Sequence, residues 1–208
     1  LDHEIQPYDP VTGELVAWVK VPALSGSTDT SLYIYYGNTI LAEGENQWNA
    51  AGVWDSDYTG VWHLKETTGG TGEIKDSNNS NHGTDYNNPT LGADGQIDGA
   101  IDFVGTSSQY VSIPYNNLGS VLTYSMWFKK TGSGNQVIFT YMRTGIRLED
   151  AAIRFWPDLT VGAEVSSWSA DSRWNHLAVV QEDTTCTMYL NGQVIHGPES
   201  ANAINAED

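Results

Sequence analysis

The sequence contains little cysteine, few basic residues and no long hydrophobic run. Cys186 is the single cysteine among 208 residues, so no disulfide can form within the chain. Nine basic residues stand against 26 acidic ones, which gives a formal net charge of −17. Such a charge repels nucleic-acid backbones and anionic lipid surfaces. No apolar stretch approaches the roughly 20 residues of a membrane-spanning helix. These absences argue against nucleic-acid partners and membrane insertion.

Turn-forming residues and short alternating segments are abundant instead. The chain has 21 glycines beside many Asn, Ser, Thr and Asp residues, which are typical of tight turns. Hydrophobic residues make up 39% and charged residues 17%, so a packed core is feasible. No segment keeps an apolar period of 3.6 residues, and we therefore expect little helix. The composition predicts an all-β protein of one large domain or two small ones.

Period-two alternation predicts where the strands lie. The N-terminal region offers 15–22 and 31–38, and a run of short strands follows from residue 54. We expect inward-facing side chains at Ile101, Phe103, Val111, Ile113, Leu122, Tyr124, Met126 and Phe128. Further strands are predicted at 136–142, 146–156, 159–165, 174–182 and 185–190. Asn191-Gly192 is a strong signal for a hairpin turn that joins TMYL to QVIH.

Six segments between Gly60 and His196 carry a family resemblance. They read GVWHLKE (60–66), DSNNSNHGT (76–84), GQIDGAIDFVGTSSQYVSIP (95–114), YSMWFKK (124–130), RWNHLAVV (173–180) and TMYLNGQVI (187–195). In this order and spacing they resemble the laminin-G-like, concanavalin A-like family. The resemblance implies an antiparallel jelly-roll β-sandwich over residues 54–208. It also implies a module that binds a ligand, often a carbohydrate, rather than transforming one.

The N-terminal segment carries a second resemblance. Its matching residues are Glu4, Ile5, Trp18, Val19, Lys20, Val21, Pro22 and Tyr35-Tyr36-Gly37-Asn38. Residues 1–45 thereby resemble the C-terminal part of a bacterial domain of unknown function, which often precedes laminin-G-like modules in surface proteins. This combination implies a module of a larger extracellular or cell-surface bacterial protein.

Both ends of the sequence look abrupt beside these families. The chain opens with Leu1 in mid-pattern, and the segment 198–208 is polar where the laminin-G-like family has a closing strand. A sandwich that lacks a strand exposes an unpaired edge. We therefore expect self-association through the incomplete edge, or through exchange of the N-terminal segment 1–45 between two copies. The alternative is that residues 1–45 fill the gap within the same chain.

Patterns for catalysis are missing from the sequence. Glycosidases of this fold use a Glu-x-Asp-x-x-Glu strand to bring two carboxylates together, and the chain has no such strand. Glu149-Asp150 and Glu182-Asp183 are adjacent pairs, which point to opposite faces of a strand. Cys186 shares one face of a predicted strand with Met188 and Leu190, so a buried, inert thiol is the favoured interpretation. The sequence therefore favours a non-catalytic binding module over a glycoside hydrolase module, a degenerate hydrolase or a structural spacer of an adhesin.

The stretch 76–85 concentrates hard oxygen ligands on one turn. Asp76, Asn78, Asn81 and Asp85 lie within ten residues, and such groups suit Ca²⁺, which takes six to eight oxygens. The competing interpretation is a loop whose side chains bind its own backbone. A structural calcium ion at these four residues is the metal prediction.

Sugar recognition commonly places an aromatic ring beside amide and carboxylate groups. Trp62, Trp127 and Trp174 fall inside the family pattern and are expected to pack in the sandwich. Trp156 and Trp168 stand near turns and are the better candidates for exposure. Basic residues gather between Lys129 and Arg173, where they accept an acidic glycan or pair with surplus carboxylates. The predicted ligand-binding residues are Trp156, Trp168, Tyr141 and Arg143.

Overall fold

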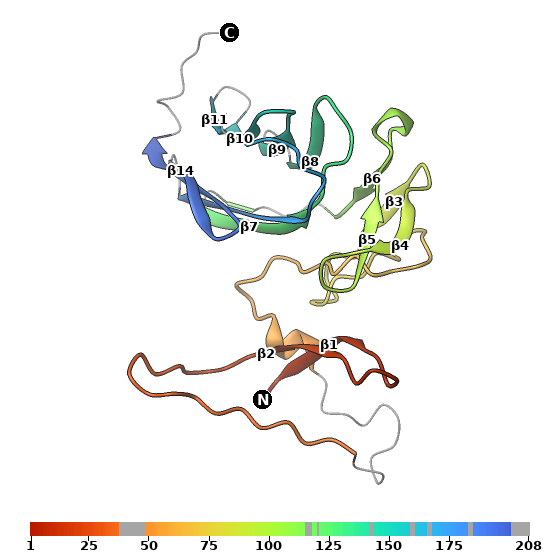
Figure 1. Cartoon of the computed structure of the whole chain (residues 1–208), viewed down its shortest axis with the longest axis vertical. Coiled ribbons are helices and arrows are strands. Elements are labelled where there is room, and N and C mark those ends of the chain that lie inside the picture. Colours follow the sequence, from red (N-terminus) through yellow and green to blue (C-terminus); the bar gives the residue numbers. More distant parts are fainter. Residues whose placement is uncertain are drawn as a thin grey trace. The chain divides into compact units, whose positions relative to one another are not determined.

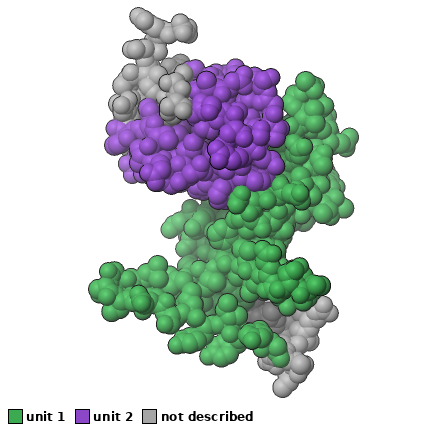
Figure 2. All heavy atoms as spheres, viewed as in Figure 1, with its two compact units in different colours: residues 1–116 green, residues 117–208 purple. Residues whose placement is uncertain are grey.

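The computed structural model divides the chain into two compact units, residues 1–116 and 117–208 (Figure 2). It describes residues 1–37, 49–114, 118–119, 121–141, 144–158, 161–165, 168–182 and 185–200. Strands account for 43% of the structure and helix for 4%, and the sheets are antiparallel, which confirms the predicted all-β class. The predicted sandwich begins at residue 54, whereas residues 54–114 group with the N-terminal segment in the first unit.

The second unit contains two four-stranded antiparallel sheets. One has the order β14-β13-β12-β7 and the other the order β11-β10-β9-β8. The strands are β7 (Val121–Phe128), β8 (Gln136–Tyr141), β9 (Thr144–Leu148), β10 (Ile153–Asp158), β11 (Val161–Val165), β12 (Asn175–Glu182), β13 (Thr185–Leu190) and β14 (Gln193–Ser200). The two sheets face each other as the layers of a sandwich (Figure 1).

Apolar side chains from both sheets meet between the layers. β7, β12 and β13 contribute Tyr124, Phe128, Leu177, Val179, Cys186 and Met188, and the facing sheet contributes Ile146, Leu148, Ile153 and Phe155. In β7 the predicted alternation is confirmed: Tyr124 and Phe128 are buried, and Leu122 and Met126 pack against the same core. Cys186 is 2% exposed, so its predicted place on the core face is confirmed.

Two turns in this unit define where the strands end. The predicted continuous strand 146–156 is wrong, because the Glu149 N–H donates to the carbonyl of Ala152 and closes a turn between β9 and β10. The predicted hairpin at 191–192 is confirmed. Asn191 and Gly192 both have positive φ, 50° and 79°, as a type I′ turn between two strands requires. The strand after this turn, β14, continues to Ser200.

The first unit is built from smaller pieces. Three two-stranded antiparallel sheets pair β1 with β2, β3 with β6 and β4 with β5. Their bounds are β1 (His3–Tyr8), β2 (Leu15–Val19), β3 (Thr84–Tyr86), β4 (Thr90–Asp94), β5 (Gly99–Asp102) and β6 (Tyr110–Ser112), accompanied by the helix α1 (Ala50–Val53) and the 3₁₀ turn Gly105–Ser107. Val53 and Ile74 are the buried hydrophobic side chains among the described residues of this unit.

Three predictions for the first unit are wrong. Residues 31–37 form no strand, and Tyr35 is 94% exposed. An alternating segment has strand propensity, but a strand also needs a neighbour to accept its hydrogen bonds. Phe103 and Ile113 were expected to face inward, yet they are 44% and 37% exposed. Each lies just past a strand that belongs to a two-stranded sheet, which offers little surface to pack against.

Candidate functional site

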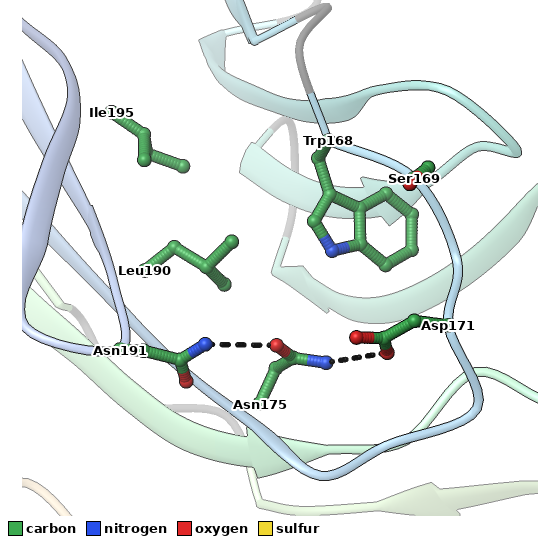
Figure 3. A pocket seen from close by; sticks show the side chains of 7 residues that line it. All are labelled: Trp168, Ser169, Asp171, Asn175, Leu190, Asn191 and Ile195. Atoms are coloured by element: carbon green, nitrogen blue, oxygen red, sulfur yellow. Dashed lines mark hydrogen bonds between the residues drawn. The ribbon is translucent and has the colours of Figure 1, made fainter.

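A pocket of about 280 Å³ opens in the second unit, beside the turn between β13 and β14. It is called the Asn175 pocket below, and Figure 3 shows its lining. The lining residues are Trp168, Ser169, Asp171, Asn175, Leu190, Asn191 and Ile195. They come from the loop before β12, from the first residue of β12, and from the ends of β13 and β14 around the hairpin turn. Three segments of the chain therefore converge on one small volume.

A chain of hydrogen bonds crosses the floor of the pocket. The Asn191 side-chain amide donates to Oδ1 of Asn175 at 2.9 Å, and the Asn175 amide donates to Oδ1 of Asp171 at 3.3 Å (Figure 3). Asn175 also donates to the carbonyl of Arg173 at 3.0 Å and is only 5% exposed. Asn191 Oδ1 accepts the His176 N–H at 2.9 Å. These bonds fix the amide groups in place before any ligand arrives.

The Asp171 carboxylate, the last group in this row of hydrogen bonds, is held in its ionised form. The Arg173 backbone N–H donates to Asp171 Oδ1 at 3.0 Å, and the Arg173 guanidinium donates to Oδ2 at 2.8 Å. The backbone hydrogen bond is the largest influence, and it lowers the pKa of Asp171 together with the side-chain hydrogen bonds, against a smaller opposing effect of burial. The pocket therefore presents an ionised carboxylate at neutral pH, and the Arg173 guanidinium is its counter-charge.

The opposite wall of the pocket is apolar. Trp168 is 7% exposed and meets the ring of Phe128 edge-on, with the ring centroids 5.9 Å apart. Leu190 and Ile195, which Figure 3 shows in the lining, pack against the same core. The predicted exposure of Trp168 is wrong. Its sequence neighbours are typical of a turn, which suggested exposure. The indole instead belongs to the core between the two sheets, where it meets Phe128, and this tertiary contact buries it.

Comparisons with known families identify the fold. Residues 105–208, half of the chain, match the Laminin_G_3 model, whose description is concanavalin A-like lectin/glucanases superfamily. The chain belongs to this superfamily. Residues 1–62 match the model of a domain of unknown function, DUF2341. No curated protein and no solved structure matches the chain.

Both predicted resemblances are thereby confirmed. A laminin-G-like domain is typically a binding module, and the concanavalin A-like superfamily also includes glycosidases. Membership supports a generic carbohydrate-binding type of module. Within the described residues, no helix is both long and apolar enough to span a membrane.

The other predicted ligand residues of this concanavalin A-like chain lie outside the pocket lining. Trp156 is a half-buried residue of β10, and the guanidinium carbon of Arg147 lies 5.7 Å from the centroid of its ring. Tyr141 is the last residue of β8. Arg143 falls outside the described residues. Of the four predicted ligand residues, Trp168 is the one that lines the Asn175 pocket.

The tryptophans of the family pattern divide between partial burial and exposure. Trp127 is 43% exposed on β7, so its predicted packing inside the sandwich is wrong. The outward position follows from the strand period, because its neighbours Met126 and Phe128 face the core. Trp62 and Trp174 are half-buried, and the Trp62 indole N–H donates to the carbonyl of Asn81 at 2.9 Å.

Basic residues of the second unit pair with carboxylates. Arg147 and Arg154 both donate to Glu149 Oε1, and Lys130 donates to Asp150 Oδ1 at 2.9 Å. Burial raises the pKa of Glu149, but the hydrogen bonds and charges of the two arginines outweigh it and lower the pKa overall. For these residues the charge-pairing alternative is the observed one. Both carboxylates of the adjacent pair Glu149-Asp150 therefore form ion pairs with basic side chains of the same unit.

The predicted calcium loop is organised around Asp76, which is 1% exposed. Oδ1 accepts the N–H groups of Val61 at 2.8 Å and Asn78 at 3.2 Å, and Oδ2 accepts those of Asn81 at 3.0 Å and Ser80 at 3.4 Å. The carboxylate is thus saturated by backbone donors, as in the competing interpretation. The side-chain amides of Asn78 and Asn81 donate to the carbonyls of Tyr58 at 2.8 Å and Thr59 at 2.7 Å.

Asp85 contacts a different part of the backbone. It lies in β3, and its Oδ1 accepts the N–H of Gly70 at 2.5 Å. Among the described residues, no group of three or more His, Cys, Asp or Glu side chains is placed to hold a metal ion. The calcium site of Asp76, Asn78, Asn81 and Asp85 stays a prediction, and the ion would compete for oxygens that backbone N–H groups already contact.

Sequence reasoning missed Asp171, Asn175 and Asn191 as site residues. Asn175 lies within the segment RWNHLAVV and Asn191 within the hairpin, so the family pattern and the turn signal accounted for both. Asn191 and Asn175 are 16 residues apart in the chain and meet through the antiparallel register of β12 and β13. The available signal is an Asn at the start of the first strand and another directly after the second, because these two positions meet at the same end of an antiparallel pair.

Proposed function

We propose that this chain is a non-catalytic binding module that recognises a carbohydrate in the Asn175 pocket. One observation carries the proposal: a fixed row of amide and carboxylate groups faces an apolar wall across a small hollow. Sugar rings present apolar C–H faces and polar hydroxyl edges, so they fit a site with this division. Binding pockets are commonly apolar with a few polar groups that fix the orientation of the ligand.

Each side of the pocket has a defined role in this proposal. Leu190 and Ile195 contact the C–H face of the sugar, and Trp168, held against Phe128, completes this apolar part of the lining. Asp171 accepts hydrogen bonds from sugar hydroxyls, because an ionised carboxylate has acceptor capacity beyond its present partners. The volume, about 280 Å³, lies just below the usual range of about 300–1,000 Å³ for small-molecule sites, which favours one sugar unit over a long chain.

The carboxylates of the second unit support binding over hydrolysis. A glycosidase needs two carboxyl groups about 5–10 Å apart across the scissile bond. The lining of the Asn175 pocket contains one carboxyl group, that of Asp171. Glu149 and Asp150 are held by arginine and lysine side chains.

The proposal includes the setting of the module. The pairing of a laminin-G-like module with the preceding domain of unknown function resembles bacterial surface proteins, so we place the chain in an extracellular or cell-surface protein. Its partner is then a glycan or a surface protein that carries one. Self-association through the sandwich edge and calcium binding at residues 76–85 stay predictions. A monomeric mass by light scattering at every concentration contradicts the first, and a melting temperature unmoved by Ca²⁺ contradicts the second.

A glycan array, probed with and without Ca²⁺, tests the main proposal. The best glycan is then titrated against wild type and Asp171→Asn, which removes the charge with little change of shape. We expect affinity to fall about tenfold or more, since hydrogen bonds to charged groups contribute about 1.5–3 kcal/mol. Glu182→Gln, at the exposed end of β12, removes one charge outside the pocket and should leave affinity unchanged. Absence of glycan binding, or equal affinity of Asp171→Asn, contradicts the proposal and favours a structural spacer.

A further inference from the structure

A second hollow, of about 260 Å³, lies in the first unit and is called the Tyr58 hollow below. Its lining residues are Ala51, Trp54, Asp55, Ser56, Tyr58, Thr59, Asn78 and Ser80. They belong to α1, to the loop that follows it, and to the Asp76-centred turn. None of these residues was singled out as a ligand-binding group from the sequence except Asn78, which was a predicted metal ligand.

Two aromatic rings form one wall of this hollow. Tyr58 is 48% exposed, and its ring meets the ring of Trp54 edge-on, with the centroids 5.1 Å apart and the planes at 75°. The aromatic surface of Tyr58 is therefore open to solvent while its position is set by the indole. An exposed aromatic ring beside a hollow is the arrangement that accepts the C–H face of a sugar ring.

The position of Trp54 is fixed from behind. Its indole N–H donates to Oε2 of Glu4 at 2.5 Å, and Trp18 packs against its ring at 5.3 Å between centroids. Glu4 is itself 4% exposed and accepts the hydroxyl of Ser77 at 2.8 Å. The aromatic wall is thus anchored on a buried carboxylate, and the ordering of the indole precedes ligand binding.

Neutral polar groups surround the rest of the hollow. Ser56, Tyr58 and Thr59 present hydroxyl groups that form no hydrogen bond with any described residue, so they are available to a ligand. The Asn78 amide nitrogen donates to the Tyr58 carbonyl at 2.8 Å, which leaves its side-chain oxygen as an acceptor. Hydroxyl and amide groups both donate and accept, as the hydroxyls of a sugar do.

Charge decides which kind of ligand fits. Asp55 is the charged residue of the lining, and its Oδ2 accepts the Lys20 ammonium at 2.9 Å while Oδ1 accepts the Asp57 N–H at 3.1 Å. Among the residues that the structure describes, the lining contains no lysine or arginine, and the cation beside it, Lys20, is already paired with Asp55. In a chain of net charge −17, an acidic ligand is repelled and a neutral one is not.

We propose that the Tyr58 hollow is a second binding site, which takes a neutral saccharide. Tyr58, supported by Trp54, contacts the C–H face of the ring. Ser56, Thr59 and Asn78 contact its hydroxyls. The site goes beyond the proposed function, because it lies in the first unit and uses none of the residues of the Asn175 pocket.

Calorimetric titration of the full chain tests this assignment with matched probes. Neutral oligosaccharides of galactose, glucose, mannose and xylose are compared with an oligomer of galacturonic acid, which differs from the galactose oligomer by a carboxylate on each ring. We expect at least one neutral oligosaccharide to bind and the acidic oligomer to bind at least tenfold more weakly. Tyr58→Ala should weaken the neutral ligand at least tenfold, and Tyr58→Phe should retain most of the affinity because the ring remains.

Control variants separate this site from the Asn175 pocket. Tyr35→Ala removes a tyrosine that is 94% exposed outside the hollow, and it should bind as wild type does. Asp171→Asn should leave the Tyr58-dependent binding unchanged. If no neutral oligosaccharide shows binding that depends on Tyr58, the assignment is wrong, whatever the outcome for Asp171. If Asp171→Asn alone abolishes all binding, the proposed function stands and the second site does not.

Discussion

In the second unit most of the buried side chains are apolar, whereas in the first unit most are polar. Between the sheets of the sandwich, Phe155, Leu177 and Met188 are fully buried. In the first unit the buried side chains are Val53, Ile74, Pro89, Glu4, Gln6, Asp76 and Asn81, as far as the described residues extend. One unit is organised around a shared apolar interior and the other around hydrogen-bond acceptors.

This difference teaches which kinds of change each unit should tolerate. Apolar burial is non-directional and contributes about 25 cal/mol per Å², so its loss scales with the volume removed. A buried carboxylate is stable only while its donors remain, and removing one partner leaves the others unsatisfied. The second unit should therefore be sensitive to cavities, and the first to the loss of single acceptors and to acid.

The largest effect is expected from Phe155→Ala in the second unit. Phe155 is 0% exposed between the two sheets, and truncation of a buried Phe costs about 3–5 kcal/mol. Hydrogen exchange read by mass spectrometry should show faster exchange in peptides of residues 121–200 and little change in residues 1–114. Val137→Ala, at a position 55% exposed, is the control and should change little. Equal acceleration of exchange in both units would contradict the separation of the two cores.

Asp76→Ala should have the next largest effect, this time in the first unit. The substitution leaves the N–H groups of Val61, Asn78, Ser80 and Asn81 without their acceptor. We expect a loss of about 2–3 kcal/mol, since unsatisfied buried donors cost about 1–3 kcal/mol each and solvent can reach some of them. Hydrogen exchange in peptides covering 58–85 measures the effect. Asp102→Ala removes an exposed carboxyl group as the control, and Asp76→Asn should lose less than Asp76→Ala.

Acid should destabilise the first unit through Glu4. Burial raises the pKa of Glu4, but the hydrogen bonds from Trp54, Ser77 and His63 together outweigh it and hold the pKa below the ordinary value of 4.5. A carboxyl group whose pKa is lower in the folded state stabilises the fold at pH values above its unfolded pKa. This stabilisation is lost as the pH falls through the folded pKa. Stability should therefore decline from about pH 4.5 downward, with exchange rising first near residues 4, 54 and 77. Glu4→Gln, which cannot titrate, should remove this part of the pH dependence.

The smallest effect is expected from Glu149→Gln on the surface of the sandwich. Its carboxylate pairs with Arg147 and Arg154, but partly exposed ion pairs contribute only about 0–1 kcal/mol. The melting temperature should fall slightly at low ionic strength, and the difference from wild type should vanish in 1 M salt. A loss that persists in high salt would mean that Glu149 acts through packing rather than charge.

Local sequence signals predicted the second unit well. Strands 174–182 and 185–190 correspond to β12 and β13, because alternation and the 191–192 turn are both encoded within a few residues. In β7 the alternation also predicted which face is buried. These elements satisfy their own hydrogen bonds with adjacent segments of the chain, so local pattern and tertiary structure agree.

Predictions failed where a distant neighbour decides the outcome. Residues 31–37 alternate like a strand but have no strand partner within the described part of the chain. Trp168 stands among turn residues, yet Phe128 and the core bury it. The prediction of Trp168 as a ligand residue rests on sequence neighbours that suggest exposure. Trp168 does line the Asn175 pocket, but as a buried side chain. The sequence could not show that Asn175 and Asn191 would meet, because that depends on the register between β12 and β13.

The burial of Cys186 has a practical consequence for dissecting the two units. It is the single sulfhydryl in the chain, it is 2% exposed, and it lies in β13 of the second unit. A thiol-reactive reagent can modify it only when the sandwich opens, so the modification rate under native conditions reports the population of open molecules. Unfolding confined to the first unit should leave that rate unchanged. The sequence therefore already contains a thiol probe that reports on opening of the second unit alone.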